Sequence, residues 1–314
     1  MENPDLTTSV GSLKFKNPVL TASGTFGYGL EYKDLLDLNE LGGIVVKGIS
    51  LKPKTGNPPQ RIIETPCGML NAIGLANIGF ETFLKDKLPL LKQYSTVRIV
   101  NIYGHSIEEY KSLAEKFSGI DGIDALEVNI SCPNVAEGGM VFGIDAILTA
   151  RVTEAVKKNT DKFVIVKLSP NVTNIQAIAR AAVDGGADAI SLINTLTGMA
   201  IDIKKRTPVL ANTIGGLSGP AIRPIALYLV HKVVSSVSIP VIGMGGIMNA
   251  SDALEFLIAG ARAVQVGTAN FVNPRVTIKI IEGIREYCHS YNITKIEDLI
   301  GTLRGPEFLG DICF

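Results

Sequence analysis

One short segment, Asn129-Ile-Ser-Cys-Pro-Asn134, places residues that could do chemistry directly after an apolar run. The letters ALEVNI are typical of a buried strand, and Pro133 cannot continue a strand because it has no N–H to donate. The Cys132 thiol can accept a proton once a nearby positive charge or ligand favours the thiolate, whereas Asn129 and Asn134 offer amides suited to a planar heterocycle. The segment therefore indicates a binding and proton-transfer site, with an inert core cysteine as the alternative.

Two lysines close β-branched runs, Lys47 in GIVVK and Lys167 in FVIVK. Burying an unpaired ammonium there would cost several kcal/mol. The pair therefore favours an anionic ligand, although a lysine that reaches solvent past a strand end is the alternative for each. The glycines of GMGG (243–246) and the pair Gly267-Thr268 predict a phosphate site, with simple turns as the alternative.

Eight short apolar runs must position these residues. They are nearly continuous rather than alternating, as expected of parallel strands covered on both faces. The runs span 18–24, 42–48, 97–101, 125–130, 163–169, 188–195, 239–246 and 262–268.

Helix patterns alternate with these runs. Examples are a capping box at Ser106-Ile-Glu-Glu109, a Thr or Asn start in TNIQAIARAAVDGG, and the same design in NASDALEFLIAG. Eight such units predict an α/β fold, a (β/α)8 TIM barrel in one domain over 1–314, with long loop insertions after strands 2 (49–96) and 6 (196–220). Both insertions should lie above the same end of the barrel. A doubly wound sheet is disfavoured, because TASGTFGYG is not a G-x-G-x-x-G turn.

In such barrels the active site lies at the carboxyl ends of the strands. Each run delivers a polar residue or glycine there, and no His, Asp or Glu on these segments is expected to compete with Cys132 as a base. The residues are Ser23, Lys47, Asn101, Asn129, Cys132, Lys167, Asn194, Thr195, Gly245, Gly246, Gly267 and Thr268.

Composition excludes several classes of protein. Lys+Arg and Asp+Glu both number 30, so no net field recruits nucleic acid or anionic lipid. The scattered cysteines 67, 132, 288 and 313 argue against a metal or iron–sulfur site in this chain. We expect no signal peptide and no membrane span, and hence a cytoplasmic protein.

The motifs NISCPN, KLSPN, INT, LSGPAIRPIAL, GMGGI and VQVGTA together resemble the dihydroorotate dehydrogenases, FMN-dependent barrels of pyrimidine biosynthesis, over residues 8–305. Cysteine at the base position resembles the soluble class 1, whereas the membrane-associated class 2 has serine there. NAIGLANIGFE, GGMVFG and IDIKKRTPVL look most like the NAD-linked class 1B.

The resemblance implies a role for each matched residue. Cys132 would be the general base. FMN would be held by Ser23, Lys47, Gly48, Asn101, Asn129, Lys167, Ile193, Gly219, Gly245, Gly246, Gly267 and Thr268. The substrate would meet Lys47, Asn71, Ala72, Ile73, Gly74, Leu75, Asn129, Asn134, Asn194 and Thr195. No role is assigned to Cys67.

The implied reaction is oxidation of dihydroorotate to orotate, with the C5 proton going to Cys132 and the C6 hydride to FMN. Electrons would pass to NAD through a partner subunit carrying FAD and a [2Fe-2S] cluster, in a heterotetramer built on a homodimer of this chain. The alternatives are a class 1A enzyme that reduces fumarate without a partner, a phosphate-binding barrel lyase or isomerase with a Schiff-base lysine, and a flavin-binding scaffold without activity.

Overall fold

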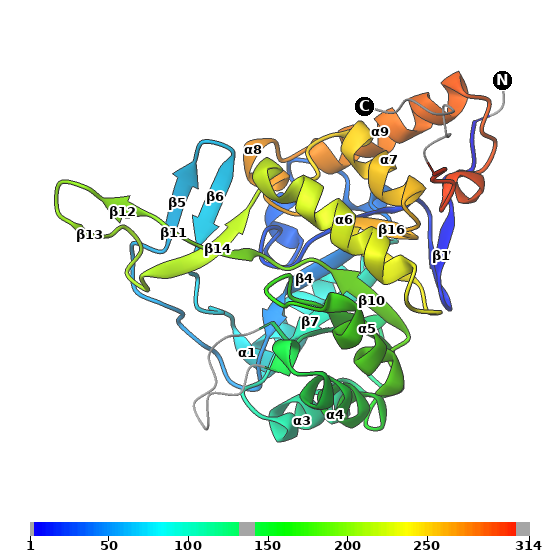
Figure 1. Ribbon diagram of the computed structural model, residues 1–314. Helices are drawn as coiled ribbons and strands as arrows, with labels where there is room; N and C mark the ends of the chain where they lie inside the picture. Colours follow the sequence, from blue (N-terminus) through cyan, green and yellow to red (C-terminus); the bar gives the residue numbers. More distant parts are fainter. Residues whose placement is uncertain (1–2, 132–141, 306–314) are drawn as a thin grey trace.

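The computed structural model describes residues 3–131 and 142–305 (Figure 1). Its centre is a closed barrel of eight parallel strands in the order β10-β15-β16-β3-β4-β7-β8-β9. The strands are β3 (Val19–Thr21), β4 (Gly43–Ile49), β7 (Val97–Ile102), β8 (Ala125–Asn129), β9 (Phe163–Lys167), β10 (Ala189–Leu192), β15 (Val241–Met244) and β16 (Ala263–Val266). Six lie within a predicted run, and β4 and β7 each extend one residue past theirs, to Ile49 and Ile102. The predicted (β/α)8 barrel is confirmed.

Helices connect the strands around the barrel. The longer ones are α3 (Ile107–Phe117), α4 (Ala146–Lys157), α5 (Ile175–Asp184), α6 (Arg223–Val234), α7 (Ala250–Ile258) and α9 (Val276–Ser290). The short ones are α1 (Gly79–Thr82), a π-helical turn over Phe83–Lys87, α2 (Leu88–Leu91) and α8 (Ala269–Val272). Single 3-10 turns span Leu30–Tyr32, Leu38–Glu40, Phe142–Ile144, Pro220–Ile222 and Ile296–Leu299. None of these helices is both long and apolar enough to cross a membrane.

The helix starts follow the predicted capping chemistry. The Ser106 hydroxyl accepts from the Glu109 N–H at 3.2 Å, and the Glu109 carboxylate accepts from the N–H of His105, one residue before the expected partner. Asn174 and Asn249 cap α5 and α7 through their side chains. These caps satisfy N–H groups that have no partner inside the helix.

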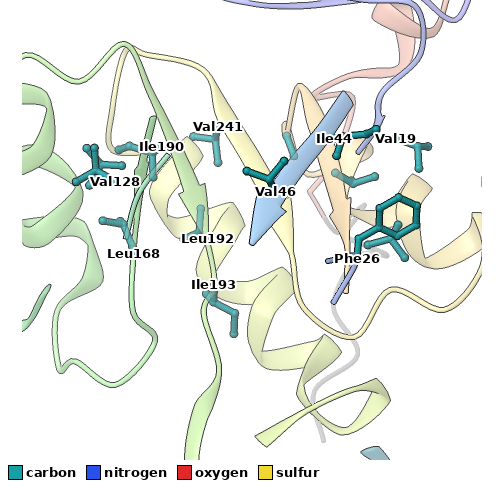
Figure 2. Close-up of a cluster of buried hydrophobic side chains, with 14 of the residues drawn as sticks. Val19, Phe26, Ile44, Val46, Val128, Leu168, Ile190, Leu192, Ile193 and Val241 are labelled. Atoms are coloured by element: carbon teal, nitrogen blue, oxygen red, sulfur yellow. The ribbon is translucent and has the colours of Figure 1, made fainter. Parts of the chain in front are cut away.

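The apolar core lies in two layers, inside the barrel and between barrel and helices. Successive strand residues point to opposite faces. In β8, Leu126 and Val128 pack outward against the helices, as do Ile190 of β10 and Val46 of β4 (Figure 2). Ala125 points inward and joins Leu20, Val45, Ile99, Ile165, Ala189, Ile242 and Ala263. The antiparallel pair β1 (Thr8–Val10) and β2 (Leu13–Phe15) contributes Val10 and Phe15 to this inner cluster.

The two long connections pair with each other. The first contributes β5 (Ile62–Thr65) and β6 (Gly68–Asn71), and the second contributes β11 (Leu196–Met199) and β14 (Ile214–Ser218). They form a four-stranded antiparallel sheet, β11-β14-β6-β5, which projects from the barrel with the small hairpin β12 (Ile201–Asp202) and β13 (Thr207–Pro208) at its tip (Figure 1). Because the connections follow β4 and β10, this sheet belongs to the carboxyl ends of the strands.

Candidate active site

The described site residues lie at one end of the barrel. Asn129 and Lys167 are the last residues of β8 and β9, and Asn101 is the fifth residue of β7. Ser23 follows β3, Lys47 and Gly48 lie late in β4, Ile193, Asn194 and Thr195 follow β10, Gly245 and Gly246 follow β15, and Gly267 and Thr268 follow β16. Because the strands are parallel, these residues form one cluster, whereas Cys132 and Asn134 lie outside the described residues.

A buried polar layer forms the floor of this cluster. Glu127 lies two residues before Asn129, and its side chain is fully buried in the barrel. Its Oε2 accepts from Asn101 Nδ2 at 2.7 Å and lies 3.6 Å from Lys167 Nζ. Its Oε1 accepts from Ser191 Oγ at 2.8 Å and from Gln265 Nε2 at 2.7 Å.

The sequence analysis considered acidic residues on these segments only as bases beside Cys132, and it did not single out Glu127. The sequence itself indicated such a residue, because a glutamate inside the buried run ALEVNI needs hydrogen-bond or charge partners. The partners themselves come from β7, β9, β10 and β16, which are far apart in the sequence. Ser191 and Gln265 were missed for the same reason.

The asparagines predicted to face the substrate lie above this layer. Asn194 Nδ2 donates to Asn129 Oδ1 at 3.3 Å, and the same oxygen accepts from the Ser131 N–H at 3.2 Å. Tyr110 Oη donates to the Asn129 carbonyl at 2.7 Å and so fixes the end of β8. Lys167 Nζ also donates to Ser23 Oγ at 3.4 Å. Ser23 follows β3, which lies across the barrel from β9, so the Lys167 side chain spans the barrel end.

Lys47 is half-buried, and no acidic group of the described chain lies within ion-pair distance of it. Burial, together with the positive charge of Arg61, lowers the pKa of the Lys47 ammonium from its ordinary value of 10.5. An anion placed beside Lys47 would relieve both effects. Lys47 is therefore a cation whose charged form an anionic ligand would stabilise.

Glycines form a second part of the site. Gly245 and Gly246 have φ angles of +125° and +77°, a region that disfavours other residues. A Cβ at Gly246 would lie 2.7 Å from the backbone N of Arg223, and one at Gly219 would lie 2.7 Å from Gly68 Cα. Thr268 Oγ1 donates to Ser218 Oγ at 2.8 Å. The end of β16 therefore meets the end of β14, and Gly246, which follows β15, lies against the start of α6.

The backbone of this glycine region has unused donors. Among the described residues, the N–H groups of Gly246 and Thr268 have no acceptor. Thr268 also stands at the N-terminus of α8. Free N–H groups at glycine-rich strand ends are suited to phosphate oxygens.

Residues 71–75 are held over the barrel by the insertion sheet. Asn71 Nδ2 donates to the Gly216 carbonyl at 3.3 Å across β6 and β14. Gly74 and Leu75 both have positive φ, +71° and +59°, which is unusual for leucine. Ala72 is buried and Ile73 is half-buried.

The strained Leu75 conformation is held by its carbonyl. That oxygen accepts from Tyr103 Oη at 2.9 Å and from Asn77 Nδ2 at 3.0 Å, and Tyr103 is fully buried. Strain of this kind persists only where neighbours fix it and is concentrated at functional sites. Sequence reasoning did not find Tyr103, which directly follows β7 and lies two residues after Asn101.

Other reactive groups lie apart. Cys67 is exposed at the turn between β5 and β6, and Cys288 is buried in α9. Within residues 3–131 and 142–305, no group of three His, Cys, Asp or Glu side chains is placed to hold a metal ion.

Comparison with known proteins identifies the family. The dihydroorotate dehydrogenase family model matches residues 5–288. A protein of Thermoanaerobacter sp. (strain X514) is 58% identical over 300 residues, covering 96% of this chain and 99% of the relative. One of Geotalea uraniireducens (strain Rf4) is 57% identical over 303 residues, with the same coverage. Both are named "Dihydroorotate dehydrogenase B (NAD(+)), catalytic subunit". The chain therefore belongs to the dihydroorotate dehydrogenase family.

Proposed function

We propose that this chain is the catalytic subunit of an NAD-linked dihydroorotate dehydrogenase, which oxidises dihydroorotate to orotate in pyrimidine biosynthesis. The observation that carries the proposal is the convergence, in a member of this family, of an unpaired cation, an asparagine pair and free backbone donors on one end of the barrel. These three features match an acidic, planar, amide-bearing substrate and a phosphorylated cofactor.

The residues present fit FMN. The free N–H groups of Gly246 and Thr268 would receive the phosphate, with Gly219, Gly245 and Gly267 keeping side chains away from it. The polar floor would receive the flavin ring through Ser23, Asn101, Asn129 and Lys167, with Lys47, Gly48 and Ile193 around it. When bound, FMN supplies the acceptor for the hydride that leaves C6 of dihydroorotate.

The chain's own residues would bind and orient the substrate. The Lys47 ammonium would pair with the substrate carboxylate, because it has no carboxylate of its own among the described residues. Asn71, Asn129, Asn134, Asn194 and Thr195 would hold the ring amides, and the backbone of 72–75 would close over the ring. Fixing the ring in one orientation lowers the barrier by removing the freedom of the two reactants.

Cys132 would take the proton from C5 as the C6 hydride leaves. The two events remove one proton and one hydride, so a C5–C6 double bond forms and orotate results. Cys132 must give the proton to solvent before the next turnover. Lys167 would balance charge that develops on the flavin edge, an electrostatic role suited to a dry site.

The names of the relatives, a catalytic subunit linked to NAD(+), support a second subunit that passes electrons to NAD. We infer that this partner carries FAD and a [2Fe-2S] cluster and joins a homodimer of this chain in a cytoplasmic heterotetramer. The same names favour NAD over fumarate as the acceptor.

The proposal is tested by anaerobic titration of the purified chain with dihydroorotate while flavin absorbance is followed. Yellow protein that bleaches in proportion to added dihydroorotate is the expected result. Yellow protein that does not bleach, alone or with its partner subunit, would reject the substrate. Protein that stays colourless after incubation with FMN would reject the cofactor and revive the lyase alternative. Reoxidation by NAD only when the partner is added, and not by fumarate, would establish the class 1B assignment.

A further inference from the structure

The buried carboxylate of Glu127 takes no direct part in the proposed reaction, yet it joins four strands beneath the proposed flavin site. It accepts hydrogen bonds from Asn101 of β7, Ser191 of β10 and Gln265 of β16 at 2.7–2.8 Å. Lys167 of β9 lies 3.6 Å away. Two of these four residues, Asn101 and Lys167, are proposed to hold FMN.

The surroundings of Glu127 are arranged for a negative charge. Each of its described polar contacts is to a group that donates, and the side chains of Glu127 and Lys167 are only 0% and 5% exposed. Two opposite charges this close and this far from water interact strongly, because little solvent screens them. The positive charge that Lys167 presents to the site is therefore partly offset from below.

Packing alone does not explain the pair. The next inward-facing residues along the same strands are Ile99, Ala125, Ile165, Ala189 and Ala263, which form an apolar layer. A buried ion pair can often be replaced by apolar residues without loss of stability. Glu127 lies directly above this apolar layer and contacts two site residues, Asn101 and Lys167. Its carboxylate therefore points to a role in the site.

We propose that Glu127 is a positioning residue that fixes Asn101 and Lys167 and offsets the Lys167 charge, thereby lowering the reduction potential of bound FMN. The inference rests on the proposed function, because it concerns residues that would contact the flavin. Reduction adds negative charge to the flavin, so a nearby positive charge raises the potential and a carboxylate that offsets this charge lowers it.

The first test is Glu127→Gln, which keeps the shape but removes the charge. The new amide can be accommodated, since the Ser191 hydroxyl can accept from it and Gln265 Oε1 has no partner among the described residues. We expect reduced FMN to bind about tenfold more tightly relative to oxidised FMN, which is a rise of about 30 mV for a two-electron couple. Anaerobic redox titration measures the potential, and fluorescence titration of apoprotein measures the affinity for oxidised FMN.

Two further variants separate charge from position. Glu127→Asp keeps the charge but shortens the side chain, so we expect a potential close to wild type and severalfold weaker FMN binding. In a Lys167→Met background, Glu127→Gln should shift the potential much less than it does with Lys167 present, because the two residues act together. Equal shifts in both backgrounds would mean that the carboxylate acts on the flavin independently of Lys167, whereas a purely structural role would leave the potential unchanged.

The outcomes are distinguishable. A potential that is unchanged or lower in Glu127→Gln, or an equal shift in both backgrounds, overturns the inference while leaving the proposed function intact. If Glu127→Gln does not fold, unchanged FMN affinity in Glu127→Asp overturns it. Wild-type protein that binds no FMN overturns the proposed function and this inference together.

Discussion

The side-chain Nδ2 of Asn194 donates to Oδ1 of Asn129 at 3.3 Å, although the two residues are 65 positions apart. The contact joins the end of β8 to the segment after β10. The other end of the Asn194 side chain, Oδ1, accepts from the Thr195 N–H at 2.8 Å, so both amides are held in fixed orientations. The two asparagines thus form one recognition unit.

Asn194→Ala should separate substrate binding from cofactor binding. We expect the KM for dihydroorotate to rise about tenfold, or roughly 1.4 kcal/mol, because one amide contact is lost and Asn129 Oδ1 keeps only one of its two donors, the Ser131 N–H. The Kd for FMN should change less than twofold. Asn129→Ala, by contrast, should weaken both ligands. Equal effects of the two substitutions on FMN would contradict the proposed division of roles.

Lys47 predicts an alkaline dependence of ligand binding. Burial and the charge of Arg61 lower its pKa from 10.5, so the free protein loses this positive charge at a lower pH than an exposed lysine. Orotate affinity should therefore fall as pH rises toward 10.5. In Lys47→Arg, which keeps its charge in this range, the fall should move to higher pH. Isothermal titration from pH 7 to 10 would measure the difference, and identical profiles would refute the assignment.

The same shift makes a prediction about stability. The folded apoprotein binds fewer protons at Lys47 than the unfolded chain does between the lowered pKa and 10.5. The free energy of unfolding of wild type, measured relative to Lys47→Met, should therefore rise with pH in that window. Chemical denaturation at several pH values measures it. If the difference between the two proteins did not change with pH, the pKa of Lys47 would not be lowered in the folded protein.

Cys132→Ala should lower turnover about 10²- to 10⁴-fold near neutral pH while FMN remains bound, because the proton acceptor is removed. Cys132→Ser should be slow but partly recovered at high pH, since a hydroxyl is a weaker acid than a thiol. Cys67→Ala is the matched control, because Cys67 is exposed at the β5–β6 turn and has no assigned role. A turnover rate of Cys132→Ala near that of wild type would show that Cys132 is not the general base.

Gly246→Ala should lose FMN affinity by tenfold or more. Its φ of +77° disfavours alanine, and the new Cβ would lie 2.7 Å from the backbone of Arg223, so the loop that offers the free N–H must shift. Gly305→Ala is the control, because nothing described lies within 4 Å of its added Cβ. Unchanged FMN binding in Gly246→Ala would place the phosphate elsewhere.

Tyr103→Phe should lower the free energy of unfolding by about 1–3 kcal/mol, because the buried partners of its hydroxyl, including the Leu75 carbonyl, lose a hydrogen bond. If the backbone of 72–75 meets the substrate, the KM should rise as well. Thermal unfolding and steady-state kinetics measure the two effects. A stability loss with no change in KM would make Leu75 a structural element only.

The sequence alone determined the barrel and the place of the site on it. Eight apolar runs separated by capped helices admit few other folds, and parallel strands must bring their carboxyl ends to one side. Lys47, Asn129 and Lys167 could be selected because each ends an apolar run where a polar residue needs a reason.

The tertiary structure decided what those residues contact. Glu127 meets Asn101, Lys167, Ser191 and Gln265 only when the barrel closes, since the four come from strands between 97 and 266. Asn71 meets Gly216 only because two insertions pair as strands. Leu75 takes a left-handed conformation because Tyr103 and Asn77 hold its carbonyl. Local pattern fixes which residues reach an edge, whereas long-range pairing and chain closure fix which of them touch.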